Sequence, residues 1–512
     1  MKQYKDFAGK KLISNTLYLF IDWFVSSVLA FLFWFILGKT MNPFEVGIVS
    51  TSNNFVVFIS IITTFGLIVA LKKLVPEIKQ KHGIKGVHSL IKLSLKPFFI
   101  TLMAIIFILL IFSKDISSII KLPFEVFIIS LVSIIFYSIF EIVNSIFIGM
   151  QNMKVSMLRN ISQMSLRIVL TIILILYGLS YFGPLLAFLL GYIFISFLRF
   201  DFRCLKSKTN IITIKNLFSY SFPALIATLF TSLILNGQYI ILSIIKNPEV
   251  TGIFTIAAVI TSLITVFSSV INSAFFPMLS GMSSIKGMGK RQGYMMGLVI
   301  RYTLFLIIPA SILLLVFSRF VIIVFSSEQF LPATQFFPML VPAAILSGIG
   351  TIMLMNLYAI GKPQLHMKLI VLSSVIFLIL AVGFTNLWSA IGLTLAILIT
   401  MLIRFSFGFG YITRFIKIKF FSRDFLKILF SSSLITLLLY FSRPFLSNIF
   451  VLILYLIPVG IVYLILLYIF RFYREEDVKI LNYFEQRVPI FGRYIRNIIN
   501  LLEKRLNRDS MD

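Results

Sequence analysis

Long apolar segments recur along the whole chain and are separated by short polar or charged connections. Each apolar segment is about 20 residues long, the length that an α-helix needs to cross the hydrocarbon core of a membrane. The first segment is too long for the apolar core of a signal peptide and no small-residue cleavage site follows it, so we expect it to be retained. The pattern predicts an all-α integral membrane protein with about fourteen transmembrane helices. The expected spans are residues 13–37, 46–71, 90–112, 124–148, 155–178, 181–200, 217–245, 250–276, 294–318, 335–358, 364–383, 388–413, 424–441 and 449–470.

The composition supports this interpretation and narrows the chemistry. Hydrophobic residues make up 59% of the 512 residues and charged residues only 12%, whereas a soluble domain is about half apolar and a quarter charged. Cys204 is the only cysteine, which excludes an intrachain disulfide. The three histidines lie in or beside expected connections, so we expect neither a metal site nor a bound cofactor.

Basic residues are distributed very unevenly between the two sides of the expected spans. With the N-terminus inside, 37 of the 46 Lys and Arg residues fall in inside segments and 6 in outside connections. This bias predicts a multi-pass protein of the cell membrane with both termini in the cytoplasm. The net charge of +28 therefore favours contact with anionic lipid headgroups at the cytoplasmic face over binding of nucleic acid.

A short sequence motif occurs twice at corresponding places. Residues Asn42–Gly47 read Asn-Pro-Phe-Glu-Val-Gly, and residues Asn247–Gly252 read Asn-Pro-Glu-Val-Thr-Gly, 205 positions later. A second echo joins Asn144–Gly149 to Asn356–Gly361 with an offset of 212. Six spans separate the copies, so we expect two six-helix lobes related by an axis along the membrane normal, with a site between them near the midplane. Packing alone is the alternative reason for the repeat.

The repeat predicts the division of the chain. We expect an N-terminal lobe at residues 1–203, a C-terminal lobe at 204–416, two additional helices at 417–472 and a basic cytoplasmic tail at 473–512. Apolar residues recur in the tail at spacings of three and four, with basic residues between them. This pattern is typical of an amphipathic helix on the membrane surface, although a partner helix would also suit it. The acidic cluster Glu475–Asp477 is interpreted as a solvated helix turn.

Polar side chains inside several expected spans are spaced by three and four residues and so share one helical face. Packing between helices is one explanation, because small polar residues join membrane helices. Since such faces occur in both expected lobes, we favour a hydrated cavity between them. Its expected lining residues are Asn15, Asn53, Asn160, Gln163, Asn236, Ser262, Thr265 and Asn272.

Five ionisable residues lie within the expected spans, where a charge needs a partner or water. Arg167, Arg301 and Arg404 are candidates for binding the phosphate of an anionic head group, because guanidinium matches phosphate geometry. Arg301 and Arg404 are also close enough to the cytoplasmic ends of their helices to snorkel. Asp22 and Glu141 are candidates for coupling transport to a proton or sodium gradient, and the alternative is that each neutralises an arginine.

Five short motifs stand in a characteristic order along the chain: Pro43–Gly47, Tyr220–Ala224, Pro248–Phe254, Phe276–Ser280 and Ala359–Pro363. In these motifs the chain resembles the polysaccharide flippases of the multidrug/oligosaccharidyl-lipid/polysaccharide exporter superfamily. The resemblance implies a fourteen-helix transporter that moves an oligosaccharide linked to polyprenyl phosphate or pyrophosphate from the cytoplasmic to the outer leaflet, for assembly of a surface polysaccharide or glycan. It implies that membrane lipids and this substrate are the partners, and it leaves polysaccharide-assembly proteins open as further ones. The chain departs from many relatives at Gln238, where they carry an acidic residue.

Two other functions remain as alternatives. A cation-coupled multidrug exporter of the same superfamily usually has twelve spans and a cavity richer in carboxylates than in arginines. A membrane enzyme such as a glycosyltransferase needs an acidic metal motif or a large outer loop, and the expected connections are short. We therefore favour a flippase and expect no enzymatic activity.

Overall fold

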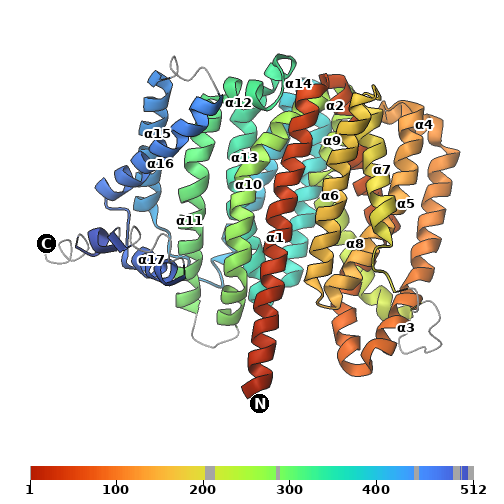
Figure 1. The fold of residues 1–512 in the computed structure, drawn as a ribbon, viewed down its shortest axis with the longest axis horizontal. Helices are drawn as coiled ribbons and strands as arrows, with labels where there is room; N and C mark the ends of the chain where they lie inside the picture. The colour runs from red at the N-terminus through yellow and green to blue at the C-terminus, as the bar shows by residue number, and fades with distance from the viewer. Residues whose placement is uncertain are drawn as a thin grey trace. The chain divides into compact units, whose positions relative to one another are not determined.

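The computed structural model describes residues 2–201, 204, 214–283, 289–442, 449–487, 496–497 and 499–504. The regular structure of these residues is helical, and they contain no strand (Figure 1). The helices in chain order are α1 Lys2–Thr40, α2 Pro43–Thr63, α3 Leu67–Ile111, α4 Ser113–Ile120, α5 Phe124–Gly149, α6 Met153–Leu176, α7 Phe182–Ser196, α8 Ile214–Leu235, α9 Gly237–Ile245, α10 Pro248–Ser283, α11 Gly289–Val316, α12 Ser318–Phe325, η2 Glu328–Phe336, α13 Phe337–Ala359, α14 Pro363–Ile412, α15 Ser422–Ser442, α16 Ile449–Ile469 and α17 Glu475–Arg487.

The described helices confirm the expected fold class. Eleven of them are long and apolar enough to cross a membrane, and two shorter apolar segments lie at Phe182–Ser196 and Ile457–Ile469. The two longest, α3 and α14, span 45 and 50 residues, and each joins two helical arms across a break. The arrangement is therefore a multi-pass membrane fold consistent with about fourteen spans.

Both long helices are broken near their middle, where the chain reverses direction. In α3 the break is at Gly83, whose φ of 62° and ψ of −159° are accessible only to glycine at low energy. In α14 the break is at Trp388 and Ser389, and Ser389 has a φ of 55°. These residues thus act as the short connections between neighbouring spans.

Two expected spans are each divided into two helices. The span predicted at 46–71 is interrupted at Gly66, which has a φ of 70° and would place a Cβ atom 2.1 Å from the backbone oxygen of Ser221 on α8. The span predicted at 217–245 is divided at Asn236, where α8 ends and α9 begins. Apolar residues continue on both sides of each break, so the length of the apolar segments does not reveal the breaks, although Asn236 and Gly237 form an Asn-Gly turn signal at the second one.

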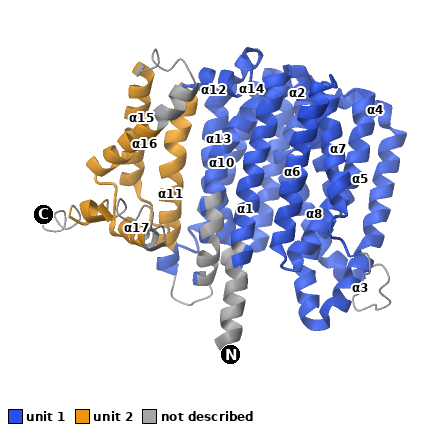
Figure 2. Ribbon diagram, viewed as in Figure 1, with its two compact units in different colours: residues 1–292, 317–417 blue, residues 293–316, 418–512 orange. Residues whose placement is uncertain are grey.

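The chain forms two compact units (Figure 2). Unit 1 comprises residues 1–292 and 317–417, and unit 2 comprises residues 293–316 and 418–512. Within unit 1, α2 packs against α5 and α10, α10 against α13, and α6 against α1 and α7. Within unit 2, α15 packs against α16. The expected lobes are defined by the sequence repeat and not by contacts, and that division stays a prediction.

We predict that Gly83→Ala destabilises the chain by about 1 to 3 kcal/mol, because alanine is strained at this φ and ψ. The matched control is Gly383→Ala, since Gly383 lies in α14 with nothing within 4 Å of its added Cβ atom. The control should be neutral or stabilising by up to about 1 kcal/mol. Heat-induced unfolding in detergent micelles, followed by circular dichroism, measures both. Equal midpoints for the two variants would contradict the assigned break.

Candidate functional site

The two copies of the repeated motif begin α2 and α10 in the same way. The side-chain oxygen of Asn42 accepts a hydrogen bond from the Glu45 backbone N–H at 3.0 Å, and the Glu45 carboxylate accepts one from the Asn42 N–H at 3.0 Å. This reciprocal pair is a capping box. At the second copy, Asn247 Oδ1 accepts a hydrogen bond from the Val250 N–H at 2.9 Å. The asparagine of each copy therefore starts its helix.

These two helix starts contact one another directly. A Cβ atom added to Gly47 would lie 1.7 Å from the Pro248 oxygen, and one added to Gly252 would lie 1.9 Å from the Pro43 oxygen. Each motif thus packs its proline carbonyl on the glycine of the other copy, the reciprocal arrangement expected at a two-fold axis. Only glycine permits this approach. We call the contact between residues 42–50 and 247–255 the seam.

The seam continues one turn further along both helices. Thr255 Oγ1 donates a hydrogen bond to Ser50 Oγ at 2.7 Å, and both side chains are buried. The two residues are again 205 positions apart. A buried polar pair of this kind gains strength from the low dielectric of its surroundings. The seam therefore combines close backbone packing with one specific hydrogen bond.

Beyond the seam, the polar face of α10 becomes accessible. Thr251 and Thr255 are buried, whereas Ser262 is exposed and Thr265 is partly exposed. On α2, Asn53 is buried and its Oδ1 atom has no hydrogen-bond partner among the described residues. Ser262 and Thr265 are thus accessible, and their role in lining a cavity stays a prediction. The side chain of Asn272 falls outside the described residues.

Asp22 on α1 lies at the start of a hydrogen-bonded chain that crosses three helices. Its Oδ2 atom accepts a hydrogen bond from Asn160 Nδ2 on α6 at 2.8 Å, and its Oδ1 atom accepts one from Ser26 at 3.2 Å. Asn160 Oδ1 in turn accepts a hydrogen bond from Asn144 Nδ2 on α5 at 3.1 Å. The structure therefore joins the predicted residues Asp22 and Asn160 and adds Asn144.

Asn144 is absent from the predicted lining, yet the sequence holds a signal for it. It begins the second echo, and its counterpart Asn356 on α13 is fully buried. In both residues the side-chain oxygen is buried without a hydrogen-bond partner among the described residues. An unpaired buried amide oxygen is unfavourable. A hydrogen-bond donor that approached either oxygen would remove this cost, and the two positions are equivalent in the repeat.

Arg167 and Gln163 pack inside the group formed by α1, α6 and α7. The Arg167 guanidinium lies 3.8 Å from the ring of Phe33 and 4.6 Å from the ring of Phe188. Its Nε and Nη2 atoms are buried and make no hydrogen bond to the described residues. Gln163 is buried beside Gly191, where an added Cβ would lie 3.3 Å from its Nε2 atom. Arg167 thus keeps two unpaired donors between two aromatic rings.

Glu141 on α5 lies among basic residues. Lys72 and Arg159 are the cations that act on it electrostatically. Arg159 is fully buried, and its Nη1 and Nη2 atoms donate hydrogen bonds to the backbone oxygens of Leu198 at 2.6 Å and Ser196 at 3.1 Å. Arg159 therefore caps the C-terminal end of α7. Arg159 lies close to the start of the span expected at 155–178, so the charge bias includes it among the 37 inside charges.

Arg404 on α14 has no hydrogen bond or ion pair to the described residues that the structure records. Its electrostatic neighbour is His366 in the first half of the same helix. Of the three predicted arginines, Arg404 therefore has the fewest partners among the described residues.

Two further residues of the predicted lining make hydrogen bonds to the protein. Asn236 donates a hydrogen bond from Nδ2 to Ser232 Oγ at 2.8 Å, at the junction of α8 and α9. Asn15 donates one to the Gln151 backbone oxygen at 3.2 Å.

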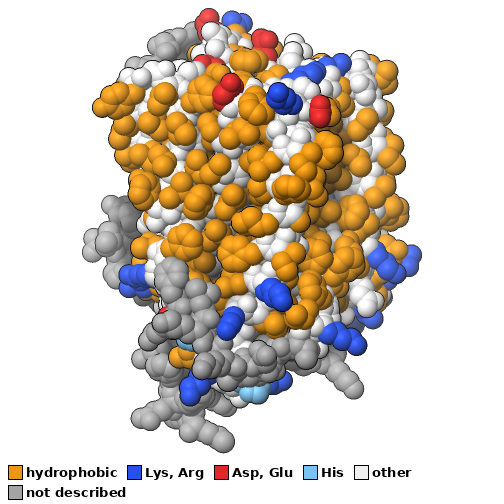
Figure 3. Space-filling model, turned by 90° about the vertical axis from the view of Figure 1, so that its right-hand side faces the viewer, with side chains coloured by type: hydrophobic (Ala, Val, Ile, Leu, Met, Phe, Trp, Pro, Cys, Tyr) orange, Lys and Arg blue, Asp and Glu red, His pale blue; other side chains and the backbone are white. Residues whose placement is uncertain are grey.

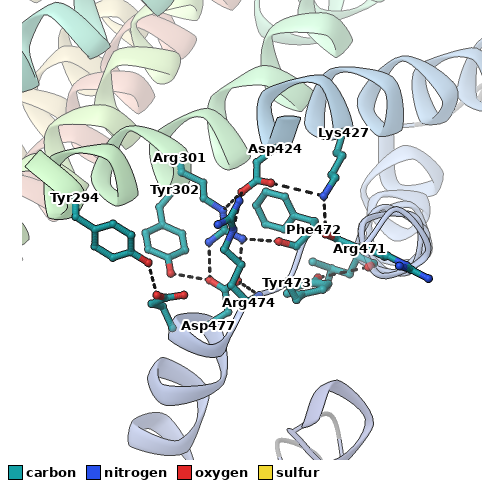
Figure 4. A network of polar contacts seen from close by, with 12 residues as sticks. Tyr294, Arg301, Tyr302, Asp424, Lys427, Arg471, Phe472, Tyr473, Arg474 and Asp477 are labelled. Carbon is teal, nitrogen blue, oxygen red and sulfur yellow. Dashed lines mark hydrogen bonds and ion pairs between the residues drawn. The ribbon is translucent and has the colours of Figure 1, made fainter. Parts of the chain in front are cut away.

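Arg301, in unit 2, is held by two carboxylates (Figure 4). Its Nη1 and Nη2 atoms donate to the two oxygens of Asp477 at 2.9 and 2.8 Å, and Nε lies 2.9 Å from Asp424 Oδ2. Nη2 also donates to the Phe472 backbone oxygen at 2.7 Å. The guanidinium is thus fully buried and paired. We therefore do not include Arg301 in the proposed head-group site.

The same network corrects the interpretation of the acidic cluster as a solvated turn. Asp477 is 8% exposed and also accepts hydrogen bonds from the Tyr302 hydroxyl at 2.6 Å and the Arg474 N–H at 2.8 Å. Tyr294 donates to the Glu476 carboxylate. Burial acts to raise the pKa of Glu476, but the Tyr294 hydrogen bond and the Arg474 charge lower it below its ordinary value. The cluster therefore anchors the start of α17 to α11.

No metal site is evident in the part of the chain that the structure describes. No group of three or more His, Cys, Asp or Glu side chains gathers closely enough there to hold an ion.

We predict that Arg301→Met destabilises the chain by about 3 to 5 kcal/mol, because it leaves two buried carboxylates without their cation. Adding Asp424→Asn and Asp477→Asn to this variant should recover part of the loss. Arg291→Met is the matched control, since Arg291 is an exposed residue of the same helix. Unfolding midpoints in detergent micelles measure the three variants. An Arg301→Met variant as stable as the control would refute the proposed pairing.

Comparisons with known proteins agree with this architecture. The model of a family described as polysaccharide biosynthesis protein matches residues 12–283. No curated protein sequence matches the chain.

The structure is similar to several solved transporters. The lipid II flippase MurJ in an inward closed conformation has a TM-score of 0.70 and 19% identity, over 88% of this chain and 98% of that one. An inward-facing multidrug resistance MATE family transporter of the MOP superfamily has a TM-score of 0.57 and 17% identity, over 78% and 95%. A Vibrio cholerae MATE transporter has a TM-score of 0.51 and 15% identity, over 79% and 96%. At these identities the likeness shows the fold.

Proposed function

The chain belongs to the polysaccharide biosynthesis protein family, and from this premise we propose that it is a flippase for a lipid-linked oligosaccharide. The substrate is an oligosaccharide on polyprenyl phosphate or pyrophosphate, moved from the cytoplasmic to the outer leaflet of the cell membrane. The fold shared with a lipid II flippase supports a lipid-linked substrate. The product would serve assembly of a surface polysaccharide or glycan. We propose no enzymatic step.

The observation that carries this proposal is the seam. It joins the starts of α2 and α10, which follow connections that the charge bias predicts to be outside. Further along α10, toward the predicted cytoplasmic side, Ser262 is exposed. A seal at one end and an accessible polar face at the other are what a transporter open to the cytoplasm requires. Breaking the seam and closing the other end would present the polar face to the outside.

Arg404 and Arg167 are the proposed ligands of the substrate phosphate. Arg404 has no recorded anionic partner among the described residues, and Arg167 has two buried donors without acceptors. A guanidinium deprived of water and counter-ion is stabilised by a phosphate that accepts its N–H groups. Arg404 lies in the C-terminal half of the repeat and Arg167 in the N-terminal half. Together they supply positive charge from both halves.

Asp22 is the proposed coupling residue. Its carboxylate is buried, accepts hydrogen bonds from Asn160 and Ser26, and has no arginine or lysine paired with it among the described residues. A buried carboxylate without a cation is stabilised by binding a proton or sodium. Glu141, by contrast, already has Lys72 and Arg159 nearby. We therefore rank Asp22 ahead of Glu141 for coupling to an ion gradient.

One observation favours a second function. The Asp22 network would suit a cation-coupled exporter of small molecules as well, and the chain shares its fold with MATE transporters. In that case the transported compound would be cationic and Arg404 would be unfavourable in its path. The two functions therefore make opposite predictions for Arg404.

The test is flipping of a fluorescent polyprenyl-pyrophosphate oligosaccharide by the full chain in proteoliposomes. We predict that flipping depends on the protein and that Arg404→Gln slows it by about tenfold to a hundredfold, the value of a lost charge-assisted hydrogen bond. Arg414→Gln is the matched control, because Arg414 is exposed just beyond the end of α14. If flipping is coupled to an ion, an imposed proton or sodium gradient changes its rate. Asp22→Asn should abolish this dependence on the gradient.

The flippase assignment fails if no lipid-linked saccharide moves while a cationic dye is expelled along an imposed gradient. The phosphate role of Arg404 fails if Arg404→Gln flips the saccharide as fast as the Arg414→Gln control.

A further inference from the structure

A cavity of about 550 Å³ lies at one end of unit 1, apart from the seam and from the Asp22 network. It is enclosed by the two arms of α3 on either side of Gly83, the C-terminal end of α5 and the segment that follows α7. Its volume is in the range of ligand-binding pockets. The turn at Gly83, the connection after α5 and the segment after α7 all belong to the side of the chain that is rich in Lys and Arg. All three are therefore predicted to be cytoplasmic.

The cavity is built by ordered features. The break at Gly83 turns the second arm of α3 back along the first, which brings Val87 and His88 to the wall opposite Lys79. Arg159 caps the end of α7 through Ser196 and Leu198 and so fixes the segment that carries Arg199.

Its floor is apolar. Val143, Phe147 and Val155 form a buried cluster against which Met150 and Phe200 pack. The floor residues Val143 and Phe147 and the wall residue Val87 line the cavity. The cavity therefore offers an apolar interior of fixed shape that water solvates poorly.

Its rim is basic. Lys79, His88 and Arg199 line it, and Asp201, the single acidic residue among the described lining residues, lies 3.8 Å from His88. The Lys79 ammonium donates one hydrogen bond to the Met150 backbone oxygen at 3.3 Å. An ammonium group has two further N–H donors. Lys79 and Arg199 are both exposed at the mouth. The rim thus carries a net positive charge over an apolar interior.

Exposed apolar residues lie in the segments that form the cavity. Ile84 lines it and is 64% exposed, and Phe197 and Leu198, which directly precede Arg199, are 45% and 43% exposed. Large apolar side chains in such positions are typical of contact with lipid. Figure 3 shows the face of the molecule that includes α3 and α5, where a broad hydrophobic band ends in Lys, Arg and His side chains toward the lower edge. The mouth therefore combines an exposed apolar side chain, Ile84, with the exposed basic residues Lys79 and Arg199.

We propose that this cavity binds an acidic phospholipid of the cytoplasmic leaflet. Its phosphate is held by Lys79 and Arg199, and its glycerol and proximal acyl chain contact Val87, Val143 and Phe147. Basic pockets at the cytoplasmic ends of membrane helices suit anionic headgroups. The apolar floor and the exposed apolar mouth favour a lipid over a soluble anion, which would leave that surface in water. This site is separate from the substrate path and stands whether or not the chain flips saccharides.

The test is native mass spectrometry of the delipidated full chain titrated with phosphatidylglycerol, and with phosphatidylcholine of the same acyl chains. We expect tighter binding of phosphatidylglycerol, and about tenfold weaker binding of it by the Lys79→Gln/Arg199→Gln variant. The matched control is Lys81→Gln/Lys85→Gln, which removes two exposed charges on either side of the Gly83 break that do not line the cavity. The control should bind as the unchanged chain does. Both variants alter exposed residues, so folding is not at stake.

Location is tested with a photoactivatable phosphatidylglycerol that carries its reactive group on the acyl chain near the glycerol. We expect labelling of residues 84–91 and 143–150, and loss of that labelling in Lys79→Gln/Arg199→Gln. Equal binding of phosphatidylcholine, equal losses in both double variants, or competition by free glycerol phosphate at the affinity of the lipid would each overturn the proposal.

Discussion

The structure depends on one steric constraint, the approach of two backbones at Gly47 and Gly252. Each glycine accommodates the proline carbonyl of the other repeat, and an added Cβ would lie within 2 Å of it. Backbones this close leave no space for side chains or water, so the seam closes one end of the α2 and α10 pair. The Thr255–Ser50 hydrogen bond then fixes the register of the two helices. Because the contact is small, it is also one that a rearrangement of two helices can break without unfolding them.

Burial of charge imposes the second constraint, and the chain resolves it in three ways. Arg301 is paired with two aspartates, so it anchors helices of unit 2. Arg159 is satisfied by backbone carbonyls at the end of α7. Arg167 and Arg404 have no anionic partner recorded among the described residues, and Arg167 stacks on aromatic rings. Charges with partners stabilise the fold, and those without are the ones that a phosphate would stabilise.

Much of this arrangement could be predicted from the sequence, because membrane spans and repeats depend on residues that are close together in the chain. The length of the apolar segments predicts the helical fold, and the Asn-Pro-(Phe)-Glu-Val pattern identifies the two helix starts that meet at the seam. The breaks at Gly66 and Asn236 are not predicted by the apolar pattern, since apolar residues continue on both sides of each, although the Asn236-Gly237 pair is a local turn signal. The partners of Arg301 lie 123 and 176 positions away, and no local pattern encodes such a pairing. The sequence therefore shows which charges are buried but not which are paired.

We propose that the seam opens during transport, and a reversible cross-link across it tests this most directly. In a Cys204→Ser background, Ser50→Cys and Thr255→Cys place two thiols at the positions that now share the 2.7 Å hydrogen bond. We predict that oxidation stops flipping of a lipid-linked oligosaccharide in proteoliposomes, that reduction restores it, and that neither single cysteine variant responds. Undiminished flipping by fully cross-linked protein would show that the seam does not need to open.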